Sequence, residues 1–277
     1  MNASLYIQAD FKNNKTYLRK AYHTTPFKLA NITEDKSQPV LHLMLMNSSP
    51  GILDGDEYHV KIELNEGCSL QLHTQSYQRL FNMKKGASQN TEVYMSKSSS
   101  FCYLPHPSVP HEASDFVAVN KIYLSKRCKL IWGEVLTCGR KLSGEEFVFS
   151  SYQNRTEIFL NERLVVKENL VIKPSIINVR AIGQFEGYSH QASLIYLDEG
   201  ADINKLISNI NQWLSGQENV CFGVSFLPVN GIIVRMLGFK GEQLYDCLKM
   251  ITNLFFFNQP TDIRPENNIG KPLVYAN

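Results

Sequence analysis

The sequence has little net charge, no long hydrophobic run and no closely spaced cysteines. Its 28 basic and 26 acidic residues nearly balance, which leaves a formal net charge of +2. Such a balance does not produce the basic field that drives nucleic-acid binding. No apolar run approaches the roughly 18 residues of a membrane-spanning helix. We therefore expect neither a nucleic-acid partner nor a membrane segment.

The cysteines and the amino terminus indicate the compartment. The six cysteines form no Cys-x-x-Cys pair. The amino terminus shows neither the apolar core nor the cleavage site of a signal peptide. In a long chain without such a signal, scattered cysteines are typical of reduced core thiols. The expected location is the cytoplasm.

Motifs for nucleophilic catalysis and phosphate binding are also missing. The sequence contains no Gly-x-Ser-x-Gly and no His-Glu-x-x-His. Gly139 and Gly144 approach the spacing of a phosphate loop, but two carboxylates follow where Lys and Ser or Thr are required. Four acids could form a glycosidase-like pair, although no separation is fixed: Asp56, Glu134, Glu145 and Glu146. The residues favour a protein that is not an enzyme.

From the amino terminus to about residue 197 the hydrophobic pattern is that of short strands. Leu5–Ile7, Val40–Met46 and Tyr58–Leu64 are rich in β-forming residues and separated by Pro, Gly, Asn and Asp. Tyr58–Leu64 alternates cleanly between apolar and polar positions. We predict a large, mainly β domain over residues 1–197.

A loose repeat runs through this domain. Glu66–Leu72, Ser99–Leu104 and Lys126–Trp132 each place a small polar step before a strand. A second motif follows each of them: Thr74–Phe81, Pro105–His111 and Glu134–Arg140. The recurrence is about every 30 residues, a period that suggests stacked rungs. The pattern predicts a helicoidal, β-helix-like sheet, while a two-layer sandwich fits the periodicity equally well.

The carboxy-terminal third changes to helical periodicity. Ala201–Ser215 and Gly241–Asn258 each carry one apolar stripe, and Asp202 is suited to cap the first of them. Two strands stand between these helices. We predict a small α+β layer, β-α-β-β-α with two helices, over residues 198–258 and packed on the β domain. Residues 259–277 are polar and are expected to form a mobile tail.

The stretch Arg127–Phe147 carries the most informative acid. Glu134 stands alone between two apolar runs, Cys128–Trp132 and Val135–Cys138. If it is buried, its carboxylate has to be hydrogen-bonded, ion-paired or metal-bound. Arg140 could pair with a nearby acid and hold this region in shape.

Two further polar segments each have two interpretations. The acids of Gly51–Asp56 could coordinate a divalent metal or line a polar channel, or they could cap a local turn. The uncharged run Thr74–Tyr77 could line a polar passage or form a solvated strand end.

The proline-rich segment Leu104–His111 contains two histidines, His106 and His111. They are candidate metal ligands, but two histidines without an acid or a thiol do not make a metal site by themselves. The alternative is a rigid surface turn.

Taken in chain order, five short motifs resemble one family, the urease accessory protein UreD (UreH). They span about residues 26 to 174: Ser49-Pro50-Gly51-Ile52-x-x-Gly55-Asp56, Leu72-x-Thr74-Gln75-Ser76, Tyr103-Leu104-Pro105-His106-Pro107, Trp132-x-Glu134-x-x-x-x-Gly139-Arg140 and Gly144-Glu145-x-Phe147. Gly55, Pro105, Gly139 and Arg140 belong to these motifs as structural positions.

The resemblance implies a nickel-insertion chaperone for a metalloenzyme of nitrogen metabolism. Such a protein forms a hetero-oligomer with UreF, which recruits the GTPase UreG, and docks on apo-urease. It binds Ni²⁺ only transiently and has no permanent cofactor. The family fold is mainly β and helicoidal with two helices, and its members are thought to contain a water-filled passage.

Five residues are suited to such a passage: Asp56, Glu134, Thr74, Gln75 and Ser76. Sparse carboxylates among uncharged polar groups suit a hydrated path, because a metal in transit has to leave each site. One alternative is a pure scaffold that bridges UreF and urease without metal contact and uses the helix surface around Leu206–Trp213. Another is a β-helical enzyme acting on polysaccharide, for which a secretion signal would be expected.

Overall fold

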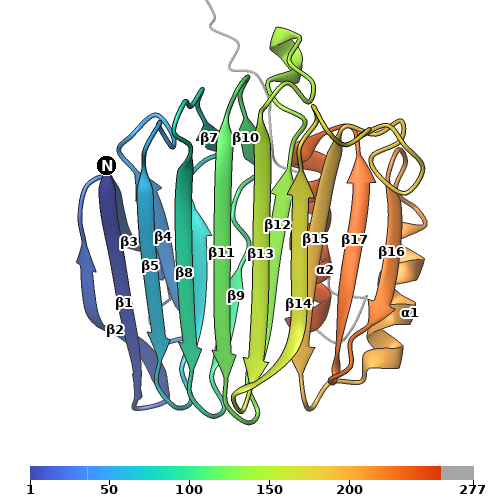
Figure 1. Cartoon of the computed structure of the whole chain (residues 1–277). Helices are drawn as coiled ribbons and strands as arrows, with labels where there is room; N and C mark the ends of the chain where they lie inside the picture. Colours follow the sequence, from blue (N-terminus) through green and yellow to red (C-terminus); the bar gives the residue numbers. More distant parts are fainter. Residues whose placement is uncertain (36, 257–277) are drawn as a thin grey trace, which may run out of the picture.

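Two β-sheets face each other across the protein, and two helices cover part of one sheet (Figure 1). The computed structural model describes residues 1–35 and 37–256. Strands dominate this part of the chain, which confirms the mainly β fold with a small helical part. The tail expected at residues 259–277 lies outside the described residues.

The first sheet contains seven strands. In spatial order they are β14 (Arg163–Ile172), β13 (Ser151–Leu160), β11 (Asp115–Leu124), β8 (Ala87–Met95), β5 (Glu57–Leu64), β1 (Asn2–Lys12) and β2 (Lys15–His23). The strands β13, β11, β8, β5 and β1 pair in parallel.

The second sheet contains ten strands. Its main path is β16 (Cys221–Phe226), β17 (Gly231–Gly238), β15 (His190–Asp198), β12 (Lys129–Leu136), β9 (Ser100–Tyr103), β6 (Ser69–Thr74), β4 (Leu41–Asn47) and β3 (Phe27–Asn31). Two short strands lie beside this path, β7 (Gln78–Leu80) and β10 (Ser108–Pro110).

The chain alternates between the sheets and forms the predicted rungs. From β5 to β12 each first-sheet strand is followed by a second-sheet strand, and equivalent strands stack in parallel. The three repeats start β6, β9 and β12 side by side: Ser69 pairs with Ser100, and Ser100 pairs with Lys129. The periodicity was compatible with either a helicoidal sheet or a two-layer sandwich. The protein combines them, because helicoidal winding of the chain builds a two-layer sandwich.

Alternating side chains build the core between the sheets. In β5 the residues at every second position, Tyr58, Val60, Ile62 and Leu64, are buried, as the sequence pattern predicts. Burial of such side chains stabilises each strand by about 1.5–3 kcal/mol per large residue. Five of the six cysteines are also buried, but Cys221 is exposed on β16. The expectation of core thiols is therefore wrong for Cys221, because β16 is an edge strand.

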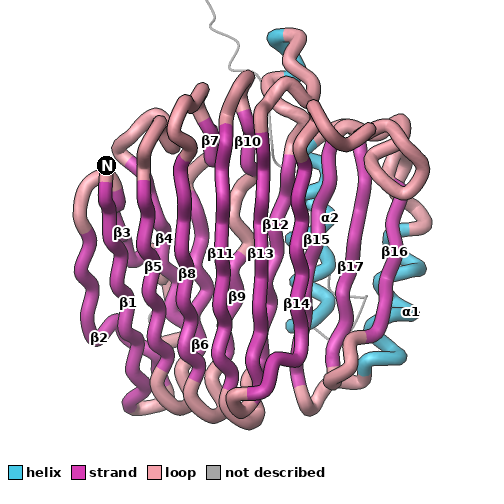
Figure 2. Tube along the Cα trace, in the orientation of Figure 1, coloured by secondary structure: helices cyan, strands magenta, loops and turns pink. Residues whose placement is uncertain are grey.

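The carboxy-terminal strands continue the second sheet. β15 pairs antiparallel with β12. Lys129 lies opposite Asp198 at one end of the pair, and Leu136 lies opposite Gln191 at the other. The helices α1 (Ile203–Leu214) and α2 (Gly241–Phe256) both lie on the outer face of this sheet (Figure 2). The Asp202 side chain caps α1 by accepting a hydrogen bond from the Lys205 amide (3.1 Å), as its position predicts.

The helix α1 turns its apolar stripe toward the sheet. Leu206 and Ile210 are buried, while Ile207 and Trp213 are only partly buried. Any partner contact through this helix therefore involves its other side chains rather than Leu206.

The family motifs gather at one end of the sandwich. The parallel strands β4, β6, β9 and β12 all end there (Figure 1). We call it the upper end and define it by the connections 48–56, 75–86, 104–114, 137–150 and 173–189. Motifs far apart in the sequence are neighbours here, because one rung of the helicoid separates each of the first four from the next.

Gly51 lies at a tight contact of the upper end. A Cβ atom at this position would overlap the backbone oxygen of Arg79 and lie 2.9 Å from the ring of Phe81. That oxygen is fixed, because it accepts a hydrogen bond from the Ile52 amide (2.8 Å). We expect Gly51→Ala to lower the free energy of unfolding by about 3 kcal/mol. Urea denaturation of the purified protein measures this.

Gly187→Ala is the matched control. Within the described chain a Cβ atom at Gly187 meets no atom within 4 Å. The expected change is below about 0.5 kcal/mol. Equal stability of the two variants would show that the contact at Gly51 relaxes freely.

Candidate functional site

A cavity of about 140 Å³ lies between the two sheets and reaches the upper end. This volume holds several water molecules, since one water needs roughly 10–15 Å³ of such space. Apolar side chains such as Phe116 and Trp132 form part of the wall. The remaining wall is polar and includes Gln78, Gln89, Thr91, Asn120, Glu134 and Asn154.

Part of the polar wall arises from inward positions of first-sheet strands. Gln89 and Thr91 of β8, Asn120 of β11 and Asn154 of β13 occupy positions where strand alternation calls for apolar residues. The register places Thr91 beside Asn120, and Ala118 beside Asn154. The sequence interpretation missed these residues, although a polar residue at an inward position of a regular strand was a usable signal.

A chain of hydrogen bonds connects the upper end with the cavity. Ser108 Oγ donates to Gln78 Oε1 (3.1 Å), and Gln78 Nε2 donates to Gln89 Oε1 (3.3 Å). Gln89 Nε2 in turn approaches Thr91 Oγ1 (3.5 Å). The polar groups of both sheets thus meet across the cavity.

Glu134 is the carboxylate of this cavity, and its side-chain partners come from both sheets. Ser193 Oγ of the adjacent β15 donates to Glu134 Oε1 (3.1 Å). Asn154 Nδ2 of β13 donates to Glu134 Oε2 from the opposite sheet. Asn120 Nδ2 donates to Asn154 Oδ1 (2.8 Å) and Thr156 Oγ1 (3.1 Å), which orients the Asn154 amide. A hydrogen-bonded carboxylate is one of the arrangements that the sequence predicts for a buried Glu134.

Burial raises the pKa of Glu134 to about 7. The hydrogen bond from Ser193 acts in the opposite direction, Glu168 raises the pKa further and Arg235 lowers it. Glu168 and Arg235 form an ion pair with each other (2.6 Å). The Glu134 side chain is partly accessible, and it lines the cavity. Near neutral pH this carboxyl group is therefore close to half-protonated.

Four of the five predicted passage residues meet at this cavity. Thr74, Gln75, Ser76 and Glu134 all line it. Asp56 is not among the lining residues. Its carboxylate accepts hydrogen bonds from the Leu53 amide (2.8 Å) and Tyr58 Oη (3.2 Å), and it pairs with the amino group of Met1 (2.9 Å). Asp56 thus supports Tyr58, a side chain that does line the cavity.

The histidines predicted as metal ligands have different surroundings. His106 lines the cavity, with Nδ1 2.8 Å from Thr74 Oγ1 and its ring 4.7 Å from that of Tyr245. His111 is buried against the ring of Phe81 (4.8 Å) and is not among the lining residues. Within residues 1–35 and 37–256 no group of three or more His, Cys, Asp and Glu side chains is arranged to hold a metal ion.

The structural motif positions shape the upper end. Gly55 (φ +75°) and Gly139 (φ +128°) have left-handed backbone conformations that favour glycine. Pro105 lines the cavity. Arg140 Nε donates to Glu145 Oε2 (2.9 Å), which identifies the acid that Arg140 pairs with.

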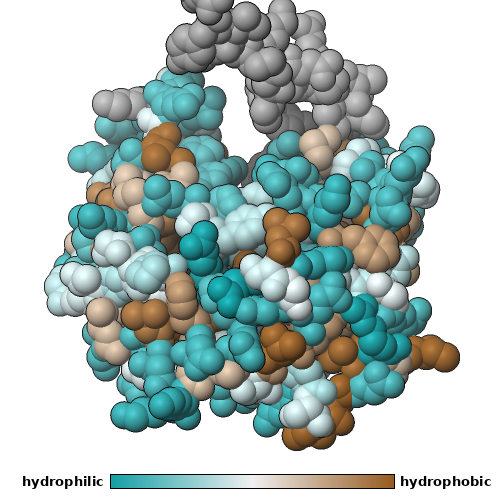
Figure 3. All heavy atoms as spheres, turned by 90° about the horizontal axis from the view of Figure 1, so that it is seen from above, coloured by the Kyte–Doolittle hydropathy of each residue, from teal (hydrophilic) through white to brown (hydrophobic). Residues whose placement is uncertain are grey.

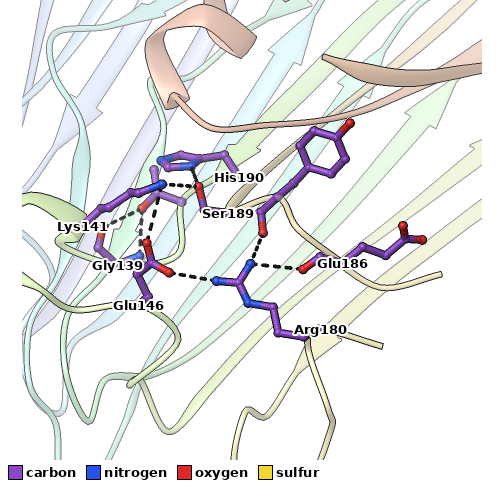
Figure 4. Close-up of polar contacts among 9 residues, drawn as sticks. Gly139, Lys141, Glu146, Arg180, Glu186, Ser189 and His190 are labelled. Atoms are coloured by element: carbon purple, nitrogen blue, oxygen red, sulfur yellow. Dashed lines mark hydrogen bonds and ion pairs between the residues drawn. The ribbon is translucent and has the colours of Figure 1, made fainter. Parts of the chain in front are cut away.

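A polar cluster ties the connection 173–189 to the connection 137–150 (Figure 4). Arg180 pairs with Glu146 (2.8 Å) and also donates to the backbone oxygen of Tyr188 (2.7 Å). Lys141 Nζ donates to Ser189 Oγ (3.1 Å), which lies 2.8 Å from Nδ1 of His190. Burial lowers the pKa of His190 to about 4, so its imidazole is neutral. These contacts hold two long loops in fixed positions.

The surface of the upper end mixes hydrophilic area with separate hydrophobic patches (Figure 3). Its connections expose large apolar side chains: Leu142, Val148, Ile176 and Ile182. Exposed apolar groups on loops held by ion pairs suit contact with another protein. No helix in the described part of the chain is long and apolar enough to span a membrane.

The fold and the cavity define a class: a helicoidal β-sandwich with a partly polar internal cavity, a carboxylate in that cavity and family motifs at one end. Comparison with known proteins identifies the family. A model of the UreD urease accessory protein matches residues 1–265, and the chain belongs to this family.

Three relatives with the name urease accessory protein UreD support this assignment. The protein of Flavobacterium johnsoniae is 48% identical over 248 residues, 89% of this chain and 90% of its own. That of Acetivibrio thermocellus is 33% identical over 253 residues, 91% of this chain and 96% of its own. That of Haemophilus influenzae (strain 86-028NP) is 32% identical over 267 residues, 92% of this chain and 98% of its own.

Proposed function

We propose that this protein delivers nickel to urease. It takes part in a cytoplasmic complex with UreF, and through UreF with UreG, and passes Ni²⁺ through its polar cavity toward the urease apoprotein. The observation that carries the proposal is the cavity itself, which combines room for water with one carboxylate, Glu134, and several uncharged oxygen and nitrogen groups.

The chemistry of the cavity suits a metal in transit. Nickel accepts imidazole, carboxylate and water ligands. A closed cage of thiolates and imidazoles would retain the ion, because such sites bind metals very tightly. Single ligands spaced along a hydrated path let the ion leave each position. Glu134 inside the cavity and His106 at its wall are single ligands of this kind.

The upper end supports the assembly of the complex. The Arg180–Glu146 ion pair connects two of its loops, and the Arg140–Glu145 ion pair lies within one of them. A rigid surface with exposed apolar side chains loses little entropy on binding. A hetero-oligomer formed through protein contacts of this kind agrees with the accessory role.

Reconstitution of urease tests the proposal. Purified apo-urease is combined with UreF, UreG, GTP, bicarbonate and limiting Ni²⁺, with or without this protein. We expect both urease activity and the nickel content of isolated urease to depend on the protein. Equal nickel content with and without it would refute the proposal.

A further inference from the structure

Two histidines from neighbouring strands meet on the outer face of the second sheet. His42 Nδ1 of β4 lies 3.3 Å from His73 Nε2 of β6. The two rings are nearly parallel, with an angle of 13° and centroids 5.6 Å apart. Both side chains are partly exposed, and the pair lies outside the cavity.

The distance between the two nitrogens fits a shared metal ion. Imidazole nitrogens bind first-row metals at about 2.1 Å, so two ligands at tetrahedral to right angles are about 3.0–3.4 Å apart. The separation of 3.3 Å falls in this range. The competing interpretation is a hydrogen bond between neutral rings, in which one nitrogen carries the proton.

The pair lies next to the wall of the cavity. Thr74 follows His73 directly, and successive residues of a strand point to opposite faces of the sheet. Thr74 accordingly lines the cavity while His73 lies outside it. Thr74 Oγ1 is 2.8 Å from His106 Nδ1, and His106 also lines the cavity. His73 is close enough to both His42 and His106 to interact electrostatically with each.

We propose that His42 and His73 form an entry site for a divalent late first-row metal ion, with water completing its coordination and with His106 as the next ligand toward the cavity. The identity of the ion as nickel rests on the proposed function. Two imidazoles do not make a permanent metal site by themselves, so water supplies the remaining ligands and the ion is bound weakly enough to move on.

Nickel binding to the purified protein alone tests the site. Isothermal titration with NiCl₂ is compared between the wild type and the double variant His42→Gln/His73→Gln. Glutamine retains hydrogen-bonding groups but is a poor nickel ligand, so a purely structural pair would be largely preserved. We expect the double variant to lose one bound Ni²⁺ per chain, or to bind it on the order of tenfold more weakly.

The double variant His23→Gln/His59→Gln is the matched control. Both residues are exposed on the first sheet, and the control removes the same number of imidazoles. It should bind nickel as the wild type does. Unchanged binding in His42→Gln/His73→Gln, with the melting temperature retained, would overturn the entry site. An equal loss in both double variants would overturn it as well, because binding would then be nonspecific.

Reconstitution separates this inference from the proposed function. If the entry site is correct, His42→Gln/His73→Gln activates urease slowly at limiting Ni²⁺ and recovers at excess Ni²⁺. If the substitutions do not affect nickel binding and urease still requires the protein, the entry site alone is refuted. If the substitutions remove a nickel site but urease does not require the protein, the proposed function is refuted. The histidine pair is then a metal-binding surface without that function.

Discussion

Replacing Ala118 by Leu should slow nickel transfer on the order of tenfold, because the width and lining of a passage set its conduction. Ala118 is buried on β11 and lines the cavity. An isobutyl group in place of the methyl group takes up much of a cavity of about 140 Å³. The substitution leaves the outer surface unchanged, so partner binding should persist. The measurements are the rate of nickel incorporation into urease and co-purification with UreF.

Ala118→Ser is the matched control, because it adds a single oxygen atom at the same position. It should transfer nickel at nearly the wild-type rate. Overpacking costs about 1–3 kcal/mol, so the melting temperature of both variants has to be compared. A folded Leu variant that activates urease at the wild-type rate would exclude the passage and favour the scaffold interpretation.

Replacing Glu134 by Gln should remove a pH dependence of stability. The pKa of Glu134 is about 7 in the folded protein, compared with 4.5 for an unperturbed carboxyl group. Between these values the folded state holds more protons than the unfolded state, so stability falls as pH rises. The loss of stability is nearly complete by about pH 8 and amounts to at most about 3.4 kcal/mol. Glutamine does not ionise, so the Glu134→Gln variant should not show this loss of stability between pH 5 and pH 8.

Chemical denaturation at pH 5 and pH 8 measures this effect as the difference between variant and wild type. Glu66→Gln is the control, since Glu66 is exposed and pairs with Lys97 at the surface (3.4 Å). A pH-independent difference for Glu134→Gln would show that the carboxyl group is already ionised across this range. In reconstitution the variant should also transfer nickel more slowly than the wild type above pH 7, where only the wild type presents a carboxylate.

Local sequence was sufficient to find Glu134 but not its partners. A single acid between two apolar runs predicts a buried carboxylate that needs hydrogen bonds. Its donors, Asn154 and Ser193, come from other strands. Their approach depends on the pairing of β12 with β15 and on the distance between the sheets. Neither of these is encoded near residue 134.

The same long-range register explains why the sequence interpretation missed the histidine pair, whereas local hydrogen bonding explains the position of Asp56. His42 and His73 meet because β4 and β6 stack in adjacent rungs, although 31 residues separate them. Asp56 was expected in the passage, but its carboxylate bonds the amide of Leu53 in its own turn. Short polar side chains often satisfy local backbone in this way. The mainly β fold and the two helices followed from periodicity, because burial of one face requires it.

The stacking of rungs also limits how the family can change in length. Deleting one residue inside β11 would turn Asn120 outward and bring its neighbours Val119 or Lys121 inward, since side chains alternate along a strand. The loops at either end of the sandwich escape this constraint, because no ladder fixes their register. Insertions and deletions among relatives should therefore occur in the connections. The side chains that line the cavity should differ among relatives by substitution alone.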